Sequence, residues 1–503
     1  MVGRVEASLP AAGEPVAVVD IGSNTIRLVV YSGLDRAAVR IFNERVFCAL
    51  GRDLSATGRL NPDGVQLARQ NLIRFTRLAR AMGIQRIDFL ATAAVREAAD
   101  GPEFAAEVER LCGQRVNVLS SREEARLSAL GVIAGFPQVS GLMGDLGGGS
   151  LEIVELDEGR IGHSITLPLG PFRLMELFGE DRKAMTREID KCLETTPWFT
   201  ASDAPEGGRS FYAVGGAWRN LARIHLEQSR YPLHVTRGYA MTFDQARDIE
   251  RAVRGAPRWP LAQVAGVSKP RAEVLPAAAL VLRRTMRKLA CPDVTFSAFG
   301  LRDGHLFDLM APEEQGRDPL IAMCEDIAGR ETRFDRMGEQ LTAWTDPLFP
   351  DQPPAARRLR QASCLLSDIA WREDSDHRAW QALDGILYYP FAGVTHPERI
   401  FLGMTGYIRQ GGDVGSDELA PFQRLLPPEV AREARILGLA QRLAYRVSGA
   451  TAAILQRSRL TYDGTELGLE LPKDGSAPGG EAVERRLKSL AQAIGAESWS
   501  VEG

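Results

Sequence analysis

Two carboxylates and a run of glycines stand together near the middle of the first half of the chain. The segment from Gly144 to Glu152 reads Gly-Asp-Leu-Gly-Gly-Gly-Ser-Leu-Glu, so Asp145 and Glu152 flank three glycines and Ser150. Glycine backbones turn tightly and can bring several N–H groups close to one anion. The segment therefore predicts a hairpin between two apolar strands whose tip holds a phosphate.

The same plan occurs earlier in the chain. The stretch 16–31 has an apolar strand, Asp20, one residue, Gly22, a small polar turn and a second apolar strand. A third site, Gly215 and Gly216, follows an apolar stretch and precedes a helix, where unpaired N–H groups and the helix dipole favour an anion. Glycines also serve plain turns, but three such sites together favour a phosphate clamp.

Acidic residues cluster around these glycines. Glu124 opens a helix just before the hairpin that carries Asp145 and Glu152. Three acids beside a phosphate would repel it unless one binds a divalent metal and another accepts a proton. For Glu124 alone, a helix N-terminal carboxylate stabilised by the dipole explains the sequence equally well. Arg96 could grip phosphate bidentately, or could be a surface arginine.

Other polar residues favour structural roles. Arg302 and Asp303 follow a predicted strand and could line a cleft, but a structural role is the favoured interpretation. His377 and His396 lack the neighbouring acidic and histidine partners that a metal site needs.

The elements that must position these residues alternate between strands and helices. In the first copy, strands are expected at 16–20, 26–31, 39–49, 87–91 and 116–119, and a polar loop at Thr92. Helices are expected at 61–82, from Arg96 or shortly before it to 112, and at 120–135. In the second copy, strands are expected from 142 and at 151–156, 161–168, 211–214 and 294–298, helices at 174–193, from 217, at 244–253 and at 271–289, and a loop at 201–208. Two such copies predict an α/β fold with two lobes flanking a cleft.

The remainder of the chain is mostly helical. After a linker at 311–317, helices are expected at 318–345, 357–371, 380–387, 400–409 and 429–447, followed by a hairpin at 458–462 and 465–471 and a helix at 481–494. The expected domains are 1–138, 139–312, 313–448 and 449–503, the last a small α+β cap.

The composition limits the class of protein. A chain of 503 residues needs several cores, and a net charge of -4 argues against a protein that coats nucleic acid. The six cysteines form no Cys-x-x-Cys pair, which favours reduced, buried thiols. The sequence shows no signal segment or membrane span, so we expect a cytoplasmic protein that binds neither membrane nor nucleic acid.

Five motifs in order resemble the exopolyphosphatase / guanosine pentaphosphate phosphohydrolase (Ppx/GppA) family. They are Asp-Ile-Gly-Ser-Asn-Thr at 20–25, Ala-Thr-x-x-x-Arg at 91–96, Glu-Glu-Ala-Arg at 123–126, Asp-Leu-Gly-Gly-Gly-Ser-Leu-Glu at 145–152 and Gly-Gly at 215–216. The family belongs to the superfamily of actin, sugar kinases and chaperone ATPases. The resemblance covers about the first 310 residues and implies duplicated ribonuclease-H-like (actin-like) lobes.

The resemblance also implies roles for the residues. Glu124 would be the base that activates water, and Asp145 and Glu152 would hold Mg²⁺ or polarise the water. The terminal phosphates would be held by Arg96 and by Gly22, Ser23, Asn24, Thr25, Gly147, Gly148, Gly149 and Ser150, and the next part of the chain by Gly215 and Gly216.

Long members of the family carry a helical HD-like domain, and residues 357–371 are similar to its core helix. Ser367-Asp368 stands where His-Asp would stand, so we expect a degenerate domain that closes over the cleft, binds the polymer or forms a homodimer.

The leading functional hypothesis is Mg²⁺-dependent exopolyphosphatase activity on inorganic polyphosphate. Hydrolysis of guanosine pentaphosphate to tetraphosphate at the same site is the nearest alternative. A third interpretation is a polyphosphate- or nucleotide-binding regulator without turnover, which the acids at Glu124, Asp145 and Glu152 argue against.

Overall fold

The computed structural model describes residues 13–196, 208–255, 263–264, 267, 269–331, 333–334, 337–477 and 479–502. The chain divides into two compact units, residues 1–316 and 317–503. The finer division into four domains stays a prediction. The loop expected at 201–208 lies outside the described residues except for Gly208.

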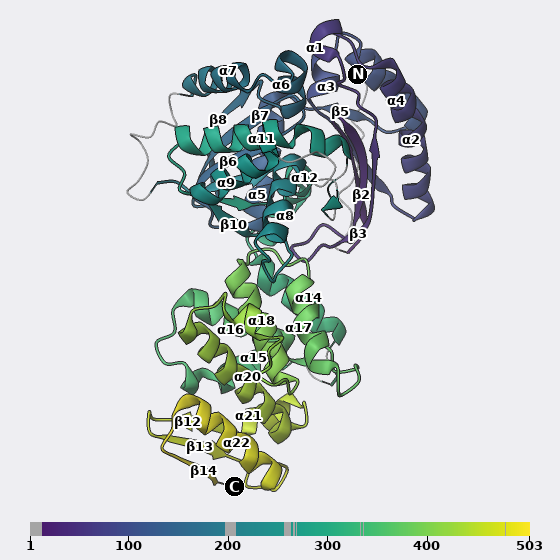
Figure 1. Ribbon diagram of the computed structural model, residues 1–503. Coiled ribbons are helices and arrows are strands. Elements are labelled where there is room, and N and C mark those ends of the chain that lie inside the picture. Colours follow the sequence, from purple (N-terminus) through teal and green to yellow (C-terminus); the bar gives the residue numbers. More distant parts are fainter. Residues whose placement is uncertain are drawn as a thin grey trace. The chain divides into compact units, whose positions relative to one another are not determined.

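The first unit contains two sheets that repeat one topology (Figure 1). The first sheet has the order β3-β2-β1-β4-β5. Its strands are β1 (Val16–Ile21), β2 (Thr25–Tyr31), β3 (Arg40–Phe47), β4 (Arg86–Ala91) and β5 (Val116–Val118). β1 to β3 form an antiparallel meander, and β4 and β5 continue the sheet in parallel.

The second sheet has the order β10-β11-β9-β6-β7-β8. Its strands are β6 (Gly141–Leu146), β7 (Leu151–Asp157), β8 (Arg160–Leu167), β9 (Phe211–Val214), β10 (Tyr239–Thr242) and β11 (Asp293–Phe296). The meander β6-β7-β8 and the parallel strands β9 and β11 match the first sheet one for one, so the predicted duplication is confirmed. The short edge strand β10 was not predicted.

The helices of this unit surround both sheets. They are α1 (Leu54–Thr57), α2 (Pro62–Ala81), α3 (Ala93–Glu97), α4 (Gly101–Cys112), α5 (Ser121–Gly135), α6 (Pro171–Phe178), α7 (Arg182–Glu194), α8 (Gly216–Gln228), α9 (Phe243–Gly255), α11 (Lys269–Lys288), α12 (Leu301–Leu309) and α13 (Pro312–Gln315).

Two helices predicted as continuous are broken, and the prediction was wrong at both points. At the first break, a Cβ on Gly101 would lie 1.8 Å from the carbonyl oxygen of Val95, so only glycine allows α4 to start against α3. At the second, Gly179 has φ +55° and ends α6, and the Asp181 side chain then accepts from the first N–H groups of α7. The periodicity of the apolar residues spans both breaks and so concealed them.

Helices α5 and α12 pack between the two sheets. Leu127 of α5 and Leu306 of α12 belong to the core under the first sheet, whereas Val132 and Phe307 of the same helices belong to a core under the second. The two helices cross so closely that a Cβ on Gly304 would lie 1.7 Å from the carbonyl oxygen of Leu127. Side chains alternate along a strand, so the residues of β1 and β6 that share a face with this layer include Asp20 and Asp145.

The second unit is helical with one small sheet. Its elements are α14 (Pro319–Glu331), α15 (Gly338–Trp344), η3 (Asp346–Leu348), α16 (Pro354–Leu365), η4 (Leu366–Asp368), α17 (Arg378–Tyr388), α18 (His396–Arg409), α19 (Ala420–Gln423), α20 (Pro428–Ser448), α21 (Ala452–Arg457), β12 (Arg459–Tyr462), β13 (Glu466–Glu470), α22 (Glu481–Ile494) and β14 (Ser498–Glu502). The predicted hairpin is β12-β13, to which β14, not predicted, adds a parallel strand.

The Ser367-Asp368 position is buried and occupied by protein partners. Arg333 donates to both carboxylate oxygens of Asp368, and Ser367 Oγ lies 2.9 Å from the hydroxyl of Tyr445. The carboxylate of Asp368 is therefore neutralised by an arginine. The HD-like character of this unit stays a prediction.

Two smaller expectations can be compared with the fold. All six cysteines are buried and unpaired, as predicted. Within the described part of the chain, no helix combines the length and the apolar character needed to cross a bilayer.

Candidate active site

The tips of the two matching hairpins face each other across the lobes. Each turn is closed by the same bond, from Gly22 N–H to the Thr25 carbonyl in the first lobe and from Gly147 N–H to the Ser150 carbonyl in the second, both 3.0 Å long. A Cβ on Gly148 would lie 2.9 Å from Nδ2 of Asn24. The tips approach so closely because the second one lacks side chains.

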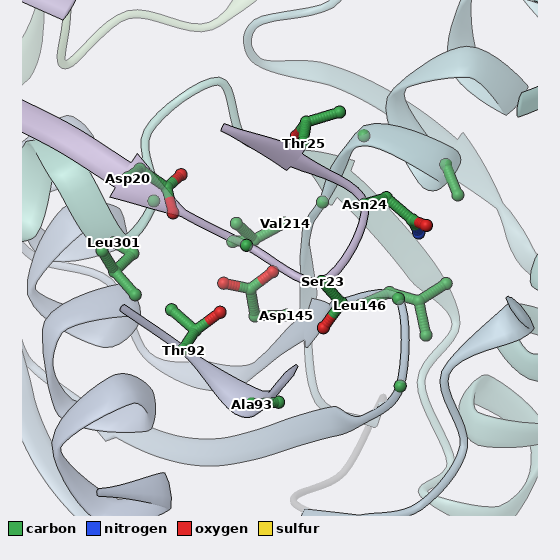
Figure 2. A pocket seen from close by; sticks show the side chains of 18 of the residues that line it. Asp20, Ser23, Asn24, Thr25, Thr92, Ala93, Asp145, Leu146, Val214 and Leu301 are labelled. Carbon is green, nitrogen blue, oxygen red and sulfur yellow. The ribbon is translucent and has the colours of Figure 1, made fainter. Parts of the chain in front are cut away.

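A cavity of about 440 Å³ lies between these tips. It is lined by all of the predicted phosphate-binding residues except Arg96: Gly22, Ser23, Asn24, Thr25, Gly147, Gly148, Gly149, Ser150, Gly215 and Gly216. Figure 2 shows Asp20, Thr92 and Asp145 around the same space, with Ser23 and Asn24 on the turn beside it. The predicted clamp therefore forms one continuous pocket.

Gly215 is required at its position for two reasons. Its φ is +115°, and a Cβ there would lie 2.5 Å from the carbonyl oxygen of Leu146. The following residue, Gly216, is the first of α8. The N-terminal N–H groups of this helix have no partner within the helix, so they can donate to an anion in the cavity.

Asp145 lines the cavity and accepts a hydrogen bond from a residue of α5. The buried hydroxyl of Ser128 donates to Asp145 Oδ2 at 2.5 Å. Burial raises the pKa of Asp145, and the bond from Ser128 opposes that rise.

Glu124 lies in the first turn of α5 and also lines the cavity. Ser120 caps this helix by accepting from the N–H of Glu123. Burial raises the pKa of Glu124 to about 7, although Arg96 opposes the rise. A carboxylate with a pKa near neutrality can accept a proton during a reaction and release it afterwards. Glu124 therefore lies both in the first turn of a helix and on the wall of the cavity, and its catalytic role stays a prediction.

Arg96 contacts Glu124 and does not line the cavity. Its Nη1 lies 2.7 Å from Glu124 Oε2 and 3.0 Å from the carbonyl oxygen of Leu119. The guanidinium is therefore not a solvated surface group, and it does not belong to the cavity wall. Direct contact between Arg96 and phosphate stays a prediction.

Glu152 lies opposite Asp145 on the neighbouring strand, is 2% exposed and does not line the cavity. Burial, reinforced by the charges of Glu124 and Asp145, raises its pKa well above the usual range. Its Oε1 is buried without a hydrogen-bond partner among the described residues. A cation next to Asp145 and Glu152 would stabilise the ionised form of Glu152 and would give its Oε1 a partner.

The donor set fits a magnesium ion shared with a phosphate. Mg²⁺ in phosphoryl-transfer sites takes one or two protein carboxylates and completes its shell with phosphate oxygens and water. In the part of the chain that the structure describes, no group of three or more His, Cys, Asp or Glu residues is arranged for a metal. The two carboxylates of Asp145 and Glu152 would therefore need substrate oxygens to complete a site.

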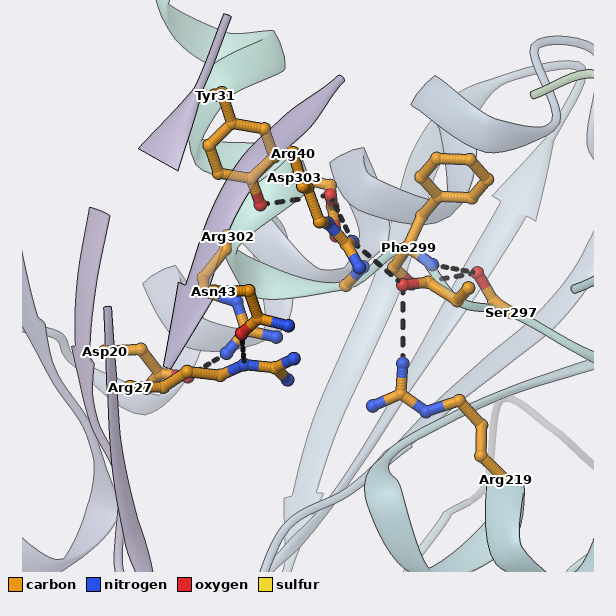
Figure 3. A network of polar contacts seen from close by, with 12 residues as sticks. Asp20, Arg27, Tyr31, Arg40, Asn43, Arg219, Ser297, Phe299, Arg302 and Asp303 are labelled. Carbon is orange, nitrogen blue, oxygen red and sulfur yellow. Dashed lines mark hydrogen bonds and ion pairs between the residues drawn. The ribbon is translucent and has the colours of Figure 1, made fainter. Parts of the chain in front are cut away.

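The structure adds residues that the sequence did not single out as site residues. Asp20 lines the cavity and pairs with Arg302, whose Nη1 lies 2.9 Å from Asp20 Oδ2 (Figure 3). Arg302 therefore lines the cavity while it pairs with Asp20, and the preference for a structural role stays a prediction. Asp20 occupies the position in its hairpin that Asp145 occupies in the other hairpin. This match in the sequence could have marked Asp20 as a candidate site residue.

Arginines line the same cavity. Arg27, Arg45 and Arg219 belong to its wall together with Arg302. Asp303, by contrast, accepts from Arg40 at 2.7 Å and from the N–H of Gly300, so its role is structural as predicted. No pattern in the sequence marked Arg27, Arg45 or Arg219, because they lie on three different elements.

Comparisons with known proteins agree with this geometry. Residues 29–313 match the sequence profile of the Ppx/GppA phosphatase family, and residues 320–500 match the profile described as exopolyphosphatase, C-terminal.

Among curated relatives, the chain is 27% identical to retrograde regulation protein 2 of Saccharomyces cerevisiae, over 62% of this chain and 58% of that protein. It is 26% identical to exopolyphosphatase 1 of Mycobacterium leprae, over 63% of this chain and 95% of that protein. A crystal structure of an exopolyphosphatase from Cytophaga hutchinsonii has the same fold, with a TM-score of 0.55 at 20% identity, over 61% of this chain and 99% of that one.

Proposed function

The chain belongs to the Ppx/GppA phosphatase family, and we propose that it is an exopolyphosphatase that hydrolyses the terminal phosphate of inorganic polyphosphate. The observation that carries the proposal is the Glu124 carboxyl group, which has a pKa of about 7 and lies on the wall of a cavity built from two glycine tips. A curated relative named an exopolyphosphatase supports the choice of substrate.

In the proposed reaction, Glu124 takes a proton from a water molecule while that water attacks the terminal phosphorus. The bond from this phosphorus to the bridging oxygen breaks, and the shortened polyphosphate leaves with the electron pair of that bond. The products are orthophosphate and a chain one unit shorter. Because phosphoryl transfer depends mainly on positioning and charge stabilisation, little further chemistry is needed from the protein.

The glycine tips would supply the charge stabilisation. Backbone N–H groups at Gly147–Ser150 and at the start of α8 can donate to phosphoryl oxygens as charge builds on them. Mg²⁺ bound by Asp145 and Glu152, when present, would neutralise charge on the same oxygens. Ser128 would keep Asp145 turned toward the cavity.

Hydrolysis of guanosine pentaphosphate is a second candidate. Two aromatic rings, Phe47 and Phe172, line the cavity, and Phe47 is 40% exposed. Aromatic faces can stack a purine base. The same catalytic groups would then act on the terminal phosphate of a nucleotide.

Homodimer formation and a cytoplasmic location stay predictions.

The deciding experiment measures orthophosphate release with Mg²⁺ from long polyphosphate, tripolyphosphate and guanosine pentaphosphate side by side. We expect release from polyphosphate, and its loss in Glu124→Gln. Release from guanosine pentaphosphate alone would favour the second candidate. The absence of release from all three would favour a binding protein without turnover.

A further inference from the structure

A second cavity, of about 600 Å³, adjoins the first one at the glycine tips. The walls of both cavities include residues 23–24 of the first tip and residues 148–149 of the second. Charged side chains from both lobes line the second cavity, among them Glu97 of α3 and Arg173 of α6. Glu97 Oε2 lies 4.0 Å from Arg173 Nη1, so this ion pair joins the two lobes beside the tips.

The backbone of Arg173 is attached to the second glycine tip through the start of α6. Gly170, the N-cap of α6, donates its N–H to the carbonyl oxygen of Gly149 at 3.1 Å, and Phe172 donates to that of Gly148 at 3.2 Å. The contact is tight, because a Cβ on Gly170 would lie 2.2 Å from the carbonyl carbon of Gly149. Arg173 follows Phe172 directly, so any displacement of the tip also displaces Arg173.

Glu97 belongs to the first lobe and lies next to the arginine that contacts the candidate base. Thr92, the N-cap of α3, donates its N–H to the carbonyl oxygen of Ile21 at 3.1 Å, so α3 starts beside the first tip. Glu97 Oε1 lies 3.7 Å from Arg96 Nη2, while Arg96 Nη1 lies 2.7 Å from Glu124 Oε2. One guanidinium therefore faces two carboxylates, and its shorter contact is with Glu124.

The two carboxylates compete for Arg96, and Arg173 influences the competition. Arg173 attracts the carboxylate of Glu97 from the side of the second lobe and so weakens the attraction between Glu97 and Arg96. If the second tip is displaced, Arg173 is displaced with it, and Glu97 attracts Arg96 more strongly. The side chain of Glu97 is 46% exposed and that of Arg173 is 36% exposed, so water screens both charges and the influence is modest.

We infer that Glu97 and Arg173 are positioning residues that act through Arg96 and link the candidate base Glu124 to the placement of the second glycine tip. We call these four residues the inter-lobe network. The inference rests on the proposed function, in which Glu124 accepts a proton from water. With the tip in place, Arg96 stays on Glu124 and favours its ionised form, which is the form that can accept the proton.

Other charges act on Glu124 and must stay constant in the test. Burial raises the pKa of Glu124 most, and the charges of Asp145 and Asp20 add to the rise that Arg96 opposes. Glu124 in turn adds to the effect of burial on the pKa of Glu152. Saturating Mg²⁺ keeps the surroundings of Glu124 comparable in every variant, because none of the variants changes these acids.

The test compares the acid limb of the pH profile of kcat/KM for polyphosphate at saturating Mg²⁺. Glu97→Gln removes the competing carboxylate, so the limb should move to lower pH by roughly 0.3–0.5 of a pH unit, the size expected for partly exposed ion pairs. Arg173→Gln strengthens the attraction between Glu97 and Arg96, so the limb should move to higher pH by a similar amount. Arg173→Lys should restore the wild-type limb. In the Glu97→Gln background, Arg173→Gln should cause no further shift.

Two matched controls separate the inter-lobe network from a general effect of charge. Arg52→Gln and Glu176→Gln remove the same charges from the wall of the second cavity, outside the network, and should leave the acid limb as in wild type. Shifts of Glu97→Gln and Arg173→Gln in the same direction would overturn the inference, because a simple tether between the lobes loses its function in either variant. Shifts no larger than those of the controls would also overturn it.

A titration without turnover distinguishes this inference from the proposed function. The carboxyl carbon of Glu124 is followed by NMR in protein with isotopically labelled glutamate, and its signal is assigned by its absence in Glu124→Gln. Opposite shifts of its titration midpoint in Glu97→Gln and Arg173→Gln would support the inter-lobe network even if the wild type releases no phosphate, in which case the proposed function alone fails. Equal midpoints in the wild type and both variants would overturn the network even if the enzyme is active.

Discussion

Arg96 Nη1 lies 2.7 Å from Glu124 Oε2 and joins the last turn of α3, which follows β4, to the first turn of α5. Burial alone would raise the pKa of Glu124 further than the value of about 7 that it has, and the charge of Arg96 limits the rise. Arg96 therefore acts on the candidate base rather than on the cavity. This pair links the positions of two motifs that the sequence shows separately.

The first prediction concerns the base itself. Glu124→Gln keeps the size of the side chain but cannot accept a proton, so we expect kcat to fall about 10²- to 10⁴-fold, the usual contribution of general acid–base catalysis. Polyphosphate binding should largely survive. Steady-state phosphate release and calorimetric titration measure the two effects. The neighbouring Glu123→Gln is the matched control, because Glu123 pairs with Arg126 and is outside the cavity lining. Equal kcat values in Glu124→Gln and wild type would exclude Glu124 as the base.

The second prediction concerns pH. The base works only when it is deprotonated, so kcat/KM for the free enzyme should fall as the pH drops through about 7. Arg96 lowers the pKa of Glu124, and its removal in Arg96→Gln should therefore raise that pKa and move the acid limb of the profile to higher pH. Arg96→Lys keeps a positive charge and should shift the limb less. An acid limb at the same pH in all three proteins would show that Arg96 does not control the base.

The third prediction concerns magnesium. A chelator should abolish phosphate release and added Mg²⁺ should restore it. Glu152→Gln should raise the Mg²⁺ concentration needed for half-maximal activity, because Gln removes the charge that a buried cation would balance. Ser128→Ala removes the bond that positions Asp145 and should have a smaller effect in the same direction. An activation curve for Glu152→Gln that overlays the wild type would remove Glu152 from the metal site.

The fourth prediction concerns the packing of the lobes. In Gly304→Ala the added Cβ would lie 1.7 Å from the carbonyl oxygen of Leu127, so α5 and α12 must move apart. We expect a loss of about 1–3 kcal/mol in the free energy of unfolding, typical of overpacked cores. Thermal and denaturant unfolding measure it. The control is Gly385→Ala in α17, where the nearest atom would be 3.7 Å away, and that variant should be as stable as wild type or more so. Equal melting temperatures for Gly304→Ala and wild type would contradict the close crossing.

Much of the fold and part of the site follow from the sequence alone. Strand and helix positions follow from apolar periodicity, and the two hairpins follow from Asp20 and Asp145 before matching glycine turns. These signals are local, because backbone conformation at glycine and the alternation of side chains depend on near neighbours in the chain. The pattern of apolar residues did not reveal the breaks at Gly101 and Gly179. At Gly101 the backbone of Val95 approaches too closely for a side chain, and at Gly179 a single dihedral angle ends the helix.

Tertiary structure decided which charges meet. Arg302 and Asp20 are 282 positions apart, and Arg96 and Glu124 are 28 apart, yet each pair shares a hydrogen bond. Burial then sets the pKa of Glu124, which no local pattern encodes. The sequence by itself determined the two glycine turns and their duplication, because these need only particular residues at particular spacings. Glu124 and Arg96 acquired their electrostatic properties only when packing removed water and brought distant charges together.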